Sequence, residues 1–381
     1  MNKSKLFEKY VLNNNVEVSN RLVVAPITLF SSNMDGSIND EELHYLKNRG
    51  KDIGMYILGS TAISPEGISA ITQPRAFSEI DLPSLRERAN LIKKQGALAI
   101  VQINHRGALA SRELGLPPVA PSSDIAKKIL ESKGIHSDTI HELTDNEIKK
   151  LIDKFAQVTE LCIKAGYDGV ELHGANNYLL QQFFSPYSNR RTDDWGGSEV
   201  KRMNFPIKVV NAVCKMREKY NRPDFIIGYR LSPEESYEGG INMDNTLELV
   251  KVLSSKPIQY IHISQKNYFQ KARNGECAGQ ERLKLIHNIT QDKMALIGVG
   301  GLLSEKDINT AINSGFTEFV GVGKASILNE DLGVLLKNGK GDKLILELDS
   351  EHPEKYNIPT NLWKMCLTGQ DWLPPLKRKN Y

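Results

Sequence analysis

Eight short apolar runs, each followed by a segment of helical periodicity, constrain the fold of this chain more than any other feature. The runs are rich in Val and Ile, as expected of parallel strands buried on both faces. Eight consecutive strand–helix units predict a closed (β/α)8 barrel of the TIM type, with functional residues at the carboxyl ends of the strands. The predicted strands are 22–25, 55–58, 98–103, 169–172, 225–231, 260–263, 295–299 and 319–322.

Helix candidates fill the intervals between these strands. The helix predicted at 145–165 has its own start signal, because Thr144 and Glu147 can form a capping box. Gly166 stands where a helix of that length should end. The other predicted helices are 85–95, 200–220, 246–253, 280–290 and 305–314.

The length of 381 residues suits one barrel with insertions. We expect the barrel to occupy residues 1–340. Residues 104–143, after the third strand, are far more than a βα loop needs and are predicted to form a lid over the mouth. Residues 341–381 are expected to form a C-terminal extension. Trp363 and Trp372 suggest that it packs on the barrel or on a neighbouring subunit of a homo-oligomer, and a basic frayed end is equally compatible.

Charge and hydropathy argue against nucleic acid and membrane partners. The net charge is only +3, and the one basic run is Lys377–Lys379 at the tail. Apolar residues make up 40% of the chain and charged residues 25%, the profile of a soluble globular protein. The N-terminus has no apolar core of a signal peptide, and no stretch approaches a membrane span. We therefore expect a cytoplasmic protein.

The four cysteines are scattered, without a Cys-x-x-Cys pair. This pattern argues against a zinc site, an iron–sulfur cluster and a disulfide framework, and it suits a reducing compartment.

The fourth predicted strand ends in three chemically active side chains, which are His173, Asn176 and Tyr178. A polar, turn-rich segment at 185–197 follows, too long for a simple connector. The three side chains could merely hydrogen-bond this loop to itself. Three such groups on one strand end nevertheless favour the mouth of an active site. His173 could instead bind zinc, but no second His, Cys or carboxylate stands nearby at the spacing of zinc ligands.

Other strand ends carry polar groups as well. Thr28 could donate a hydrogen bond into the mouth or simply bond its own turn. Gln102 could serve the edge of a ring such as a pyrimidine, or it could be a core amide. Arg230 interrupts an apolar strand and must find an anion or a set of carbonyls, so a salt bridge inside the barrel is the alternative.

Strands seven and eight end in Gly-rich turns that contain Gly300, Gly301, Gly323 and Lys324. In barrels the loops after these two strands commonly bind phosphate through backbone N–H groups. The glycines could also be simple turns. Neither segment fits the Gly-x-Gly-x-x-Gly pattern before a long helix, so no Rossmann dinucleotide site is predicted.

The pattern around the fourth strand resembles the old yellow enzyme family of flavin-dependent ene-reductases. The resemblance rests on His-x-x-Asn-x-Tyr at 173–178 and on Ser-Pro-x-Ser-Asn-x-Arg-Thr-Asp-x-x-Gly-Gly-Ser at 185–198. It extends from about Asn20 to about Leu328. The larger relatives append an iron–sulfur domain, whose cysteine run is missing here.

The resemblance implies that FMN lies across the mouth of the barrel. Thr28 would contact flavin O4, Gln102 the pyrimidine edge and Arg230 the N1–C2=O edge. The family usually has Arg where this chain has Lys324, an exchange expected to weaken the grip on phosphate. Many relatives have Trp at the position of Asn104, so the lid side of the pocket is expected to be more polar. The full set of implied cofactor residues is Ala25, Pro26, Thr28, Ser60, Gln102, Arg230, Gly300, Gly301, Gly323 and Lys324.

The resemblance also implies an activity in two halves. NADH or NADPH reduces the flavin and leaves, and an α,β-unsaturated carbonyl compound, quinone or nitro compound then binds. His173 and Asn176 would hold its oxygen while flavin N5 delivers hydride, and Phe30 would line the pocket. Tyr178 would donate a proton to the α-carbon, since a phenol keeps its proton at neutral pH.

Two other classes of function stay open on the sequence. One is a flavin-free barrel that acts on a phosphorylated metabolite, which the glycines of strands seven and eight fit equally well. That class lacks an obvious carboxylate base or Schiff-base lysine at the mouth, although Lys324 could be argued. The other is a flavin-binding protein without turnover.

Overall fold

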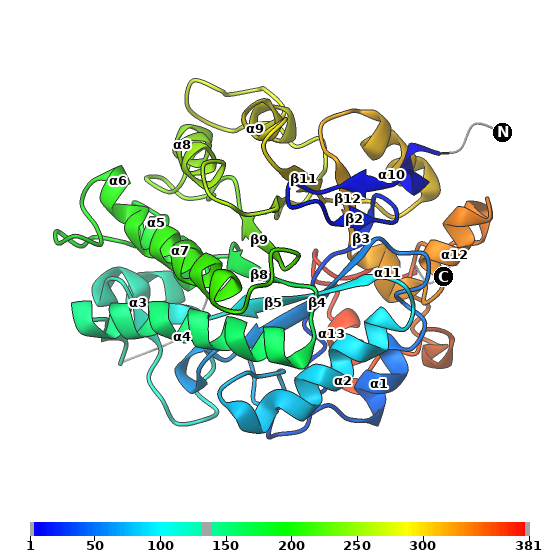
Figure 1. Ribbon diagram of the computed structural model, residues 1–381, viewed down its shortest axis with the longest axis horizontal. Helices are drawn as coiled ribbons and strands as arrows, with labels where there is room; N and C mark the ends of the chain where they lie inside the picture. The colour runs from blue at the N-terminus through cyan, green and yellow to red at the C-terminus, as the bar shows by residue number, and fades with distance from the viewer. Residues whose placement is uncertain (1–3, 132–138, 378–381) are drawn as a thin grey trace.

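The computed structural model describes residues 4–131 and 139–377 and confirms the predicted (β/α)8 barrel (Figure 1). Eight parallel strands close in the order β10-β11-β12-β3-β4-β5-β8-β9. The barrel strands are β3 (Leu22–Val24), β4 (Met55–Ala62), β5 (Leu98–Asn104), β8 (Gly169–Gly174), β9 (Ile226–Leu231), β10 (Tyr260–Ile263), β11 (Ala295–Gly298) and β12 (Phe319–Val322).

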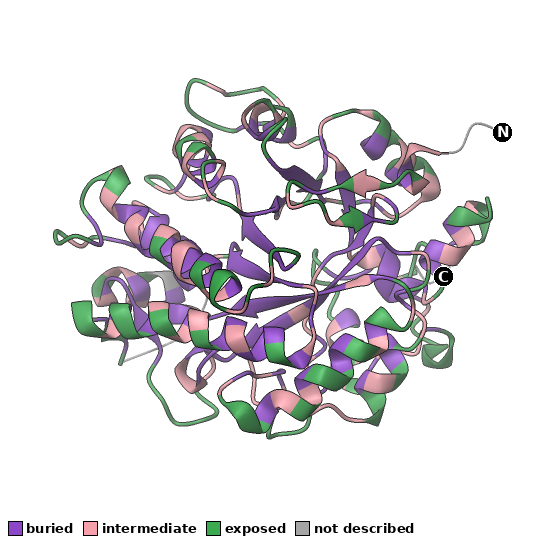
Figure 2. Ribbon diagram, in the orientation of Figure 1, coloured by how far each residue is buried: buried purple, intermediate pink, exposed green. Residues whose placement is uncertain are grey.

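Helices surround the barrel and cover the outer faces of its strands (Figure 1). Most of them bury one side and expose the other, so in Figure 2 their outer faces are green around a purple centre, whereas α5 is buried throughout. The helices of this layer are α1 (Asp40–Leu46), α2 (Leu82–Lys93), α4 (Asp145–Ala165), α5 (Leu179–Phe184), α6 (Glu199–Arg202), α7 (Asn204–Lys219), α8 (Met243–Leu253), α9 (Arg282–Thr290), α10 (Glu305–Asn313), α11 (Lys324–Leu328) and α12 (Leu332–Lys337).

The longest of these helices begins and ends as its sequence predicts. Thr144 and Glu147 form the reciprocal capping box of α4, and Gly166 ends the helix with φ +90°, a conformation that glycine adopts without strain. No helix among the described residues is both long and apolar enough to cross a membrane.

One helix prediction was wrong in its continuity. Residues 200–220 form two helices, α6 and α7, that meet at Met203. Pro206 explains the break, because proline has no N–H to donate to the carbonyl of Arg202 four residues earlier.

Buried side chains pack inside the barrel, as is typical of this fold. The bottom layer is apolar and includes Val23, Met55, Ile57 and Ile100. Small residues on one strand make room for large side chains on the neighbouring strand. A Cβ on Gly228 would lie 2.1 Å from the ring of Tyr260, so only glycine leaves room for that tyrosine. A short hairpin, β1 (Tyr10–Val11) with β2 (Glu17–Val18), packs against the same layer.

The two departures from a minimal barrel have structure of their own. Within 104–143 lie β6 (Val119–Ala120), α3 (Ser123–Glu131) and β7 (His141–Glu142), and β6 pairs with β7. The part of the predicted lid at 132–138 lies outside the described residues, as do Arg378 and Lys379 of the basic tail. The C-terminal segment contains α13 (Thr360–Cys366), which hydrogen-bonds to the barrel through Thr360 and Asn361.

Candidate active site

His173 lies at the carboxyl end of β8, opposite Arg230 of β9 in the strand register. The N–H of Ala175 donates to His173 Nδ1 at 3.2 Å, so the proton of the neutral ring is on Nε2. Burial lowers the pKa of His173 well below its ordinary value, and the charges of Arg230, His262 and Arg106 lower it further. The imidazole is therefore a neutral hydrogen-bond donor at physiological pH.

Asn176 stands in the turn after β8, in the left-handed conformation with φ +58°. Its N–H donates to Ser232 Oγ, and its Oδ1 accepts from Ser264 Oγ, each at 2.9 Å. These bonds fix the amide so that Nδ2 is left to donate elsewhere. Ser232 and Ser264 follow β9 and β10, and sequence reasoning missed both, because nothing in a lone serine predicts a partner from another strand.

Tyr178 is the N-cap residue of α5, and its ring lies beside the imidazole. The ring centroids of His173 and Tyr178 are 4.5 Å apart, at an angle of 42°. Arg106, from the segment after β5, places its guanidinium carbon 5.1 Å from the centroid of the Tyr178 ring. His173 and Tyr178 are thus brought together, and sequence reasoning missed Arg106 as their neighbour.

A buried polar network connects the interior residues of β5, β8 and β10. Gln102 Nε2 donates to Glu171 Oε1 at 2.6 Å, and Glu171 Oε2 pairs with His262 Nδ1 at 2.8 Å. Burial raises the pKa of Glu171, but His262 and Arg230 outweigh burial and keep that pKa below its ordinary value. Glu171 is therefore a buried carboxylate that orients Gln102, with the Gln102 carbonyl oxygen left to accept.

Arg230 remains without the structural salt bridge that was the alternative interpretation. Its Nε is buried and has no hydrogen-bond partner, and Arg230 forms no ion pair in the described part of the chain. Burial lowers the pKa of Arg230, and the nearby Glu171 carboxylate opposes that shift. A buried guanidinium with spare donors suits an electron-rich ligand edge at the mouth.

Thr28 and Ser60 form one hydrogen-bonded wall of the mouth. Their hydroxyl oxygens are 2.9 Å apart. Gln73 Nε2 donates to the Ser60 carbonyl at 2.7 Å and to Asn104 Oδ1 at 3.1 Å. Asn104 is fully buried, so it lies within the wall, and its Nδ2 has no partner in the described residues. Sequence reasoning missed Gln73, which stands on the loop after β4.

The glycines after β11 and β12 come from neighbouring strands and lie at the same end of the barrel. Gly300 has φ +130°, and a Cβ there would lie 2.6 Å from the backbone of Asn267. Gly301 has φ +69°, and open space surrounds it apart from the Lys266 carbonyl. The close approach of the Asn267 backbone requires glycine at position 300, and the positive φ favours it at position 301.

Lys324 begins α11 directly after Gly323, which caps the helix without any side-chain hydrogen bond. Burial lowers the pKa of Lys324, whereas the charge of Asp371 in the C-terminal segment raises it. This ammonium is therefore a partly buried cation beside the two glycine turns.

Phe30 follows β3 and adopts φ +54°, an uncommon conformation for a bulky residue. Its carbonyl accepts a hydrogen bond of 2.7 Å from Asn361 Nδ2 in α13. The C-terminal segment thus supports a residue that was predicted to line the substrate pocket.

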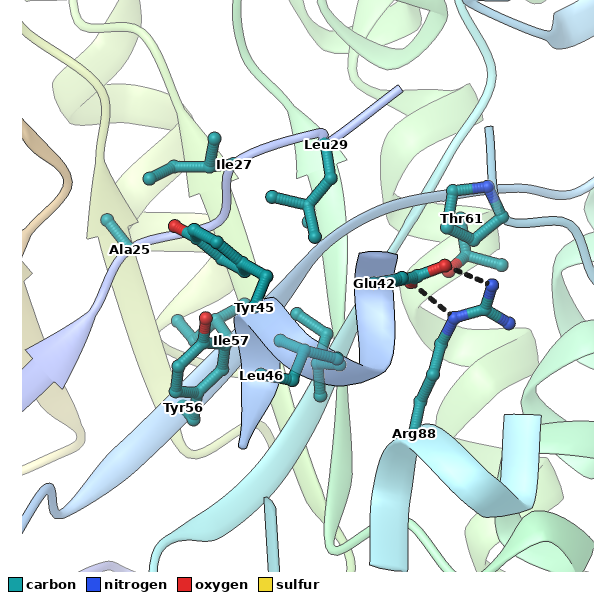
Figure 3. Close-up of a pocket in the computed structure, with 13 residues that line it drawn as sticks. Ala25, Ile27, Leu29, Glu42, Tyr45, Leu46, Tyr56, Ile57, Thr61 and Arg88 are labelled. Carbon is teal, nitrogen blue, oxygen red and sulfur yellow. Dashed lines mark hydrogen bonds and ion pairs between the residues drawn. The ribbon is translucent and has the colours of Figure 1, made fainter. Parts of the chain in front are cut away.

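A cavity next to Ala25 and Ile27 does not extend this site. Figure 3 shows that it also borders the ion pair of Glu42 and Arg88, whose nitrogen and oxygen atoms approach to 2.6 Å. Its volume is about 20 Å³, room for a single water molecule. It is therefore a packing gap between barrel and helices.

The described residues at this site offer no evident group of metal ligands. Among residues 4–131 and 139–377, no three His, Cys, Asp or Glu side chains are grouped so that they could hold a metal ion. His173 has Arg230 opposite it across the strands and Tyr178 beside its ring, and neither is a carboxylate or thiolate.

The chain is similar to known proteins over most of its length. Residues 5–343 match the model of the NADH:flavin oxidoreductase / NADH oxidase family. The chain is 36% identical to the Bacillus subtilis protein named "Probable NADH-dependent flavin oxidoreductase YqiG" over 97% of each chain. It is 33% identical to the NADH:acrylate oxidoreductase of Vibrio harveyi over 95% of this chain, but it spans only 36% of that longer protein.

Solved structures support the fold. The Old Yellow Enzyme from Pichia sp. AKU4542 superposes with a TM-score of 0.72 and 24% sequence identity, covering 88% of this chain and 87% of that one.

Proposed function

Since the chain belongs to the NADH:flavin oxidoreductase / NADH oxidase family, the family of old yellow enzyme, we propose that it reduces the double bond of α,β-unsaturated carbonyl compounds. It is an oxidoreductase that uses FMN together with NADH or NADPH. This membership removes the flavin-free barrel and the non-catalytic flavin protein as alternatives. When bound, FMN supplies the hydride, which it takes from the nicotinamide nucleotide.

The polar groups at the mouth fit FMN. The orphaned donor Nε of Arg230 suits the electron-rich edge of an isoalloxazine, and the free carbonyl of Gln102 suits its ring N–H. The hydroxyl pair of Thr28 and Ser60 can donate to a ring oxygen. We assign these groups to the ring, with Ala25 and Pro26 beside them.

The phosphate belongs, in this proposal, to the turns after β11 and β12. Gly301 has open space beside it, and Gly300 adopts a positive φ next to the Asn267 backbone. Gly323 and Lys324 add an uncapped helix start and a cation. The Lys324 ammonium attracts phosphate as a point charge, without the bidentate geometry of an arginine.

The oxidant is activated by two neutral donors, His173 and Asn176, which together we call the clamp. His173 Nε2–H and Asn176 Nδ2–H are both left free by the bonds that fix their other atoms. Hydrogen bonds from both to one carbonyl oxygen would withdraw electrons from the conjugated alkene and stabilise the negative charge that develops during hydride transfer, by a few kcal/mol. Phe30 would line the same pocket.

Tyr178 completes the reaction as proton donor. Its ring lies 4.5 Å from that of His173, so its phenol can reach a substrate held by the clamp. Donation to the α-carbon neutralises the charge left by hydride addition at the β-carbon. The adjacency of Tyr178 to a neutral, oriented His173 is the observation that carries the proposal. Quinones and nitro compounds are further oxidants that the same clamp would accept.

The name of the Vibrio harveyi relative specifies acrylate, itself an activated alkene, which supports this substrate class. The test is anaerobic. The purified yellow protein should bleach on addition of NADH or NADPH and regain its colour with 2-cyclohexenone, yielding cyclohexanone. Bleaching without reoxidation by any enone would refute ene-reduction while leaving the flavin oxidoreductase assignment intact.

A further inference from the structure

Arg106 is a cation at the mouth whose backbone is held in place on both sides. Its N–H donates to the Gly67 carbonyl at 3.0 Å, and its carbonyl accepts from Gln182 Nε2 at 3.1 Å. Gln182 belongs to α5, the helix that Tyr178 caps. The backbone of Arg106 is consequently anchored to the same helix as the proposed proton donor.

The side chain of Arg106 has no ionic partner of its own. Its Nε is buried without a hydrogen-bond partner, and within residues 4–131 and 139–377 its guanidinium forms neither an ion pair nor a hydrogen bond. Two carboxylates on adjoining segments face other residues. Glu66 lies 3.6 Å from His105 Nε2, and Glu235 accepts from Gln181 and Ser185.

A partly buried guanidinium without a counter-ion is costly unless a ligand supplies one. The position of Arg106 indicates which ligand that is. It lies over the ring of Tyr178, and its charge also acts on His173. An anion bound by Arg106 would therefore belong to a molecule that contacts Tyr178 and His173 together, as the oxidant does.

We propose that Arg106 binds a carboxylate on the oxidant, so that the preferred substrates are α,β-unsaturated carbonyl compounds that carry a carboxylate group. This inference rests on the proposed function, in which the oxidant's activating oxygen lies at His173 and Asn176. Arginine suits the role because its planar fork can bind both oxygens of a carboxylate. Its cation–π contact with Tyr178 would keep the fork beside the reacting carbons.

The test uses 4-oxopent-2-enoate, which carries a carboxylate, and its methyl ester, which does not. Because the ester also activates the alkene more strongly, the acid-to-ester ratio of kcat/KM is compared between wild type and Arg106→Gln. This ratio should be roughly 10- to 100-fold higher in the wild-type holoenzyme, as expected for one charge-assisted pair. Arg106→Gln should lose rate with the acid and spare the ester, Arg106→Lys should restore part of the loss, and Lys94→Gln, at the exposed C-cap residue of α2, should change neither rate.

A binding measurement separates this inference from the ene-reductase proposal. Levulinate and methyl levulinate, the saturated analogues, cannot be reduced, and their affinities can be measured by calorimetry. Tighter binding of levulinate that depends on Arg106 supports the inference even if no enone is turned over. Equal binding of both analogues, or an Arg106→Gln variant that loses acid and ester alike, overturns it.

The nicotinamide nucleotide is the other anion that enters this mouth, and its phosphates could engage the same guanidinium. In that case Arg106→Gln would slow flavin reduction by NADH while the carboxylate preference persisted, and the inference would be wrong. We expect flavin reduction by NADH to change less than twofold.

Discussion

Each side chain of the clamp owes its direction to a hydrogen bond, local for His173 and from a distant strand end for Asn176. Ala175 N–H occupies His173 Nδ1, and Ser264 Oγ occupies Asn176 Oδ1, so the free atoms of both residues are donors. The residue types could be predicted from the pattern at 173–178. Which atom of each remains free could not, because Ser264 stands 88 residues further along the chain.

For a single residue, Tyr178→Phe should slow one of the two half-reactions and leave the other unchanged. Reduction of the flavin by NADH or NADPH should be nearly unchanged, since the phenol is proposed to act only on the substrate carbon. Reoxidation by a cyclic enone should slow by about 10²–10⁴-fold, the usual cost of losing a general acid. Single-turnover kinetics with one enone and one quinone measure this, because quinones need no proton at carbon. Equal slowing of both oxidants would instead point to a disturbed pocket.

Among the elements, the barrel strands could be predicted because burial on both faces leaves uninterrupted apolar runs. β10 and β12 have the predicted limits, and the other strands differ by a few residues. The hairpin β1–β2 was not predicted, since strands of two residues have no readable period. The helix α13 was not predicted either. It contributes to the site through Asn361, which hydrogen-bonds to Phe30, 331 residues away in sequence.

The hydrogen bond from Asn361 to the Phe30 carbonyl should therefore matter to both stability and substrate binding. Asn361→Ala removes the donor and should lower the free energy of unfolding by about 1 kcal/mol. It should also raise KM for the enone severalfold, because Phe30 would leave its φ +54° conformation. Urea unfolding and steady-state kinetics measure the two effects. Thr360→Ala, which loses only an exposed bond to Glu41, is the matched control and should leave KM unchanged.

On the scale of the whole molecule, the interior of the barrel combines several ionisable groups in one buried network. Glu171 is held as a carboxylate between Gln102 and His262, and Arg230 lies close enough to lower the pKa of Glu171. His173 and His262 both have pKa values below the ordinary histidine range, chiefly because of burial. Folding thus selects one set of protonation states, and the stability of the protein must depend on pH.

The sign of that dependence follows from His173. Its folded pKa is lowered, so below about pH 6.5 the unfolded chain binds a proton that the folded chain does not. The stabilisation is therefore present above pH 6.5 and is lost as the pH falls. One such proton corresponds to a slope of about 1.4 kcal/mol per pH unit.

His173→Gln should reduce the loss of unfolding free energy between pH 6.5 and 5.5 by up to this amount. Urea unfolding of the holoenzyme measures it, with His44→Gln, at an exposed residue of α1, as the control. Identical slopes for wild type and His173→Gln would show that the imidazole is protonated equally in both states, and the neutral donor of the clamp would have to be abandoned.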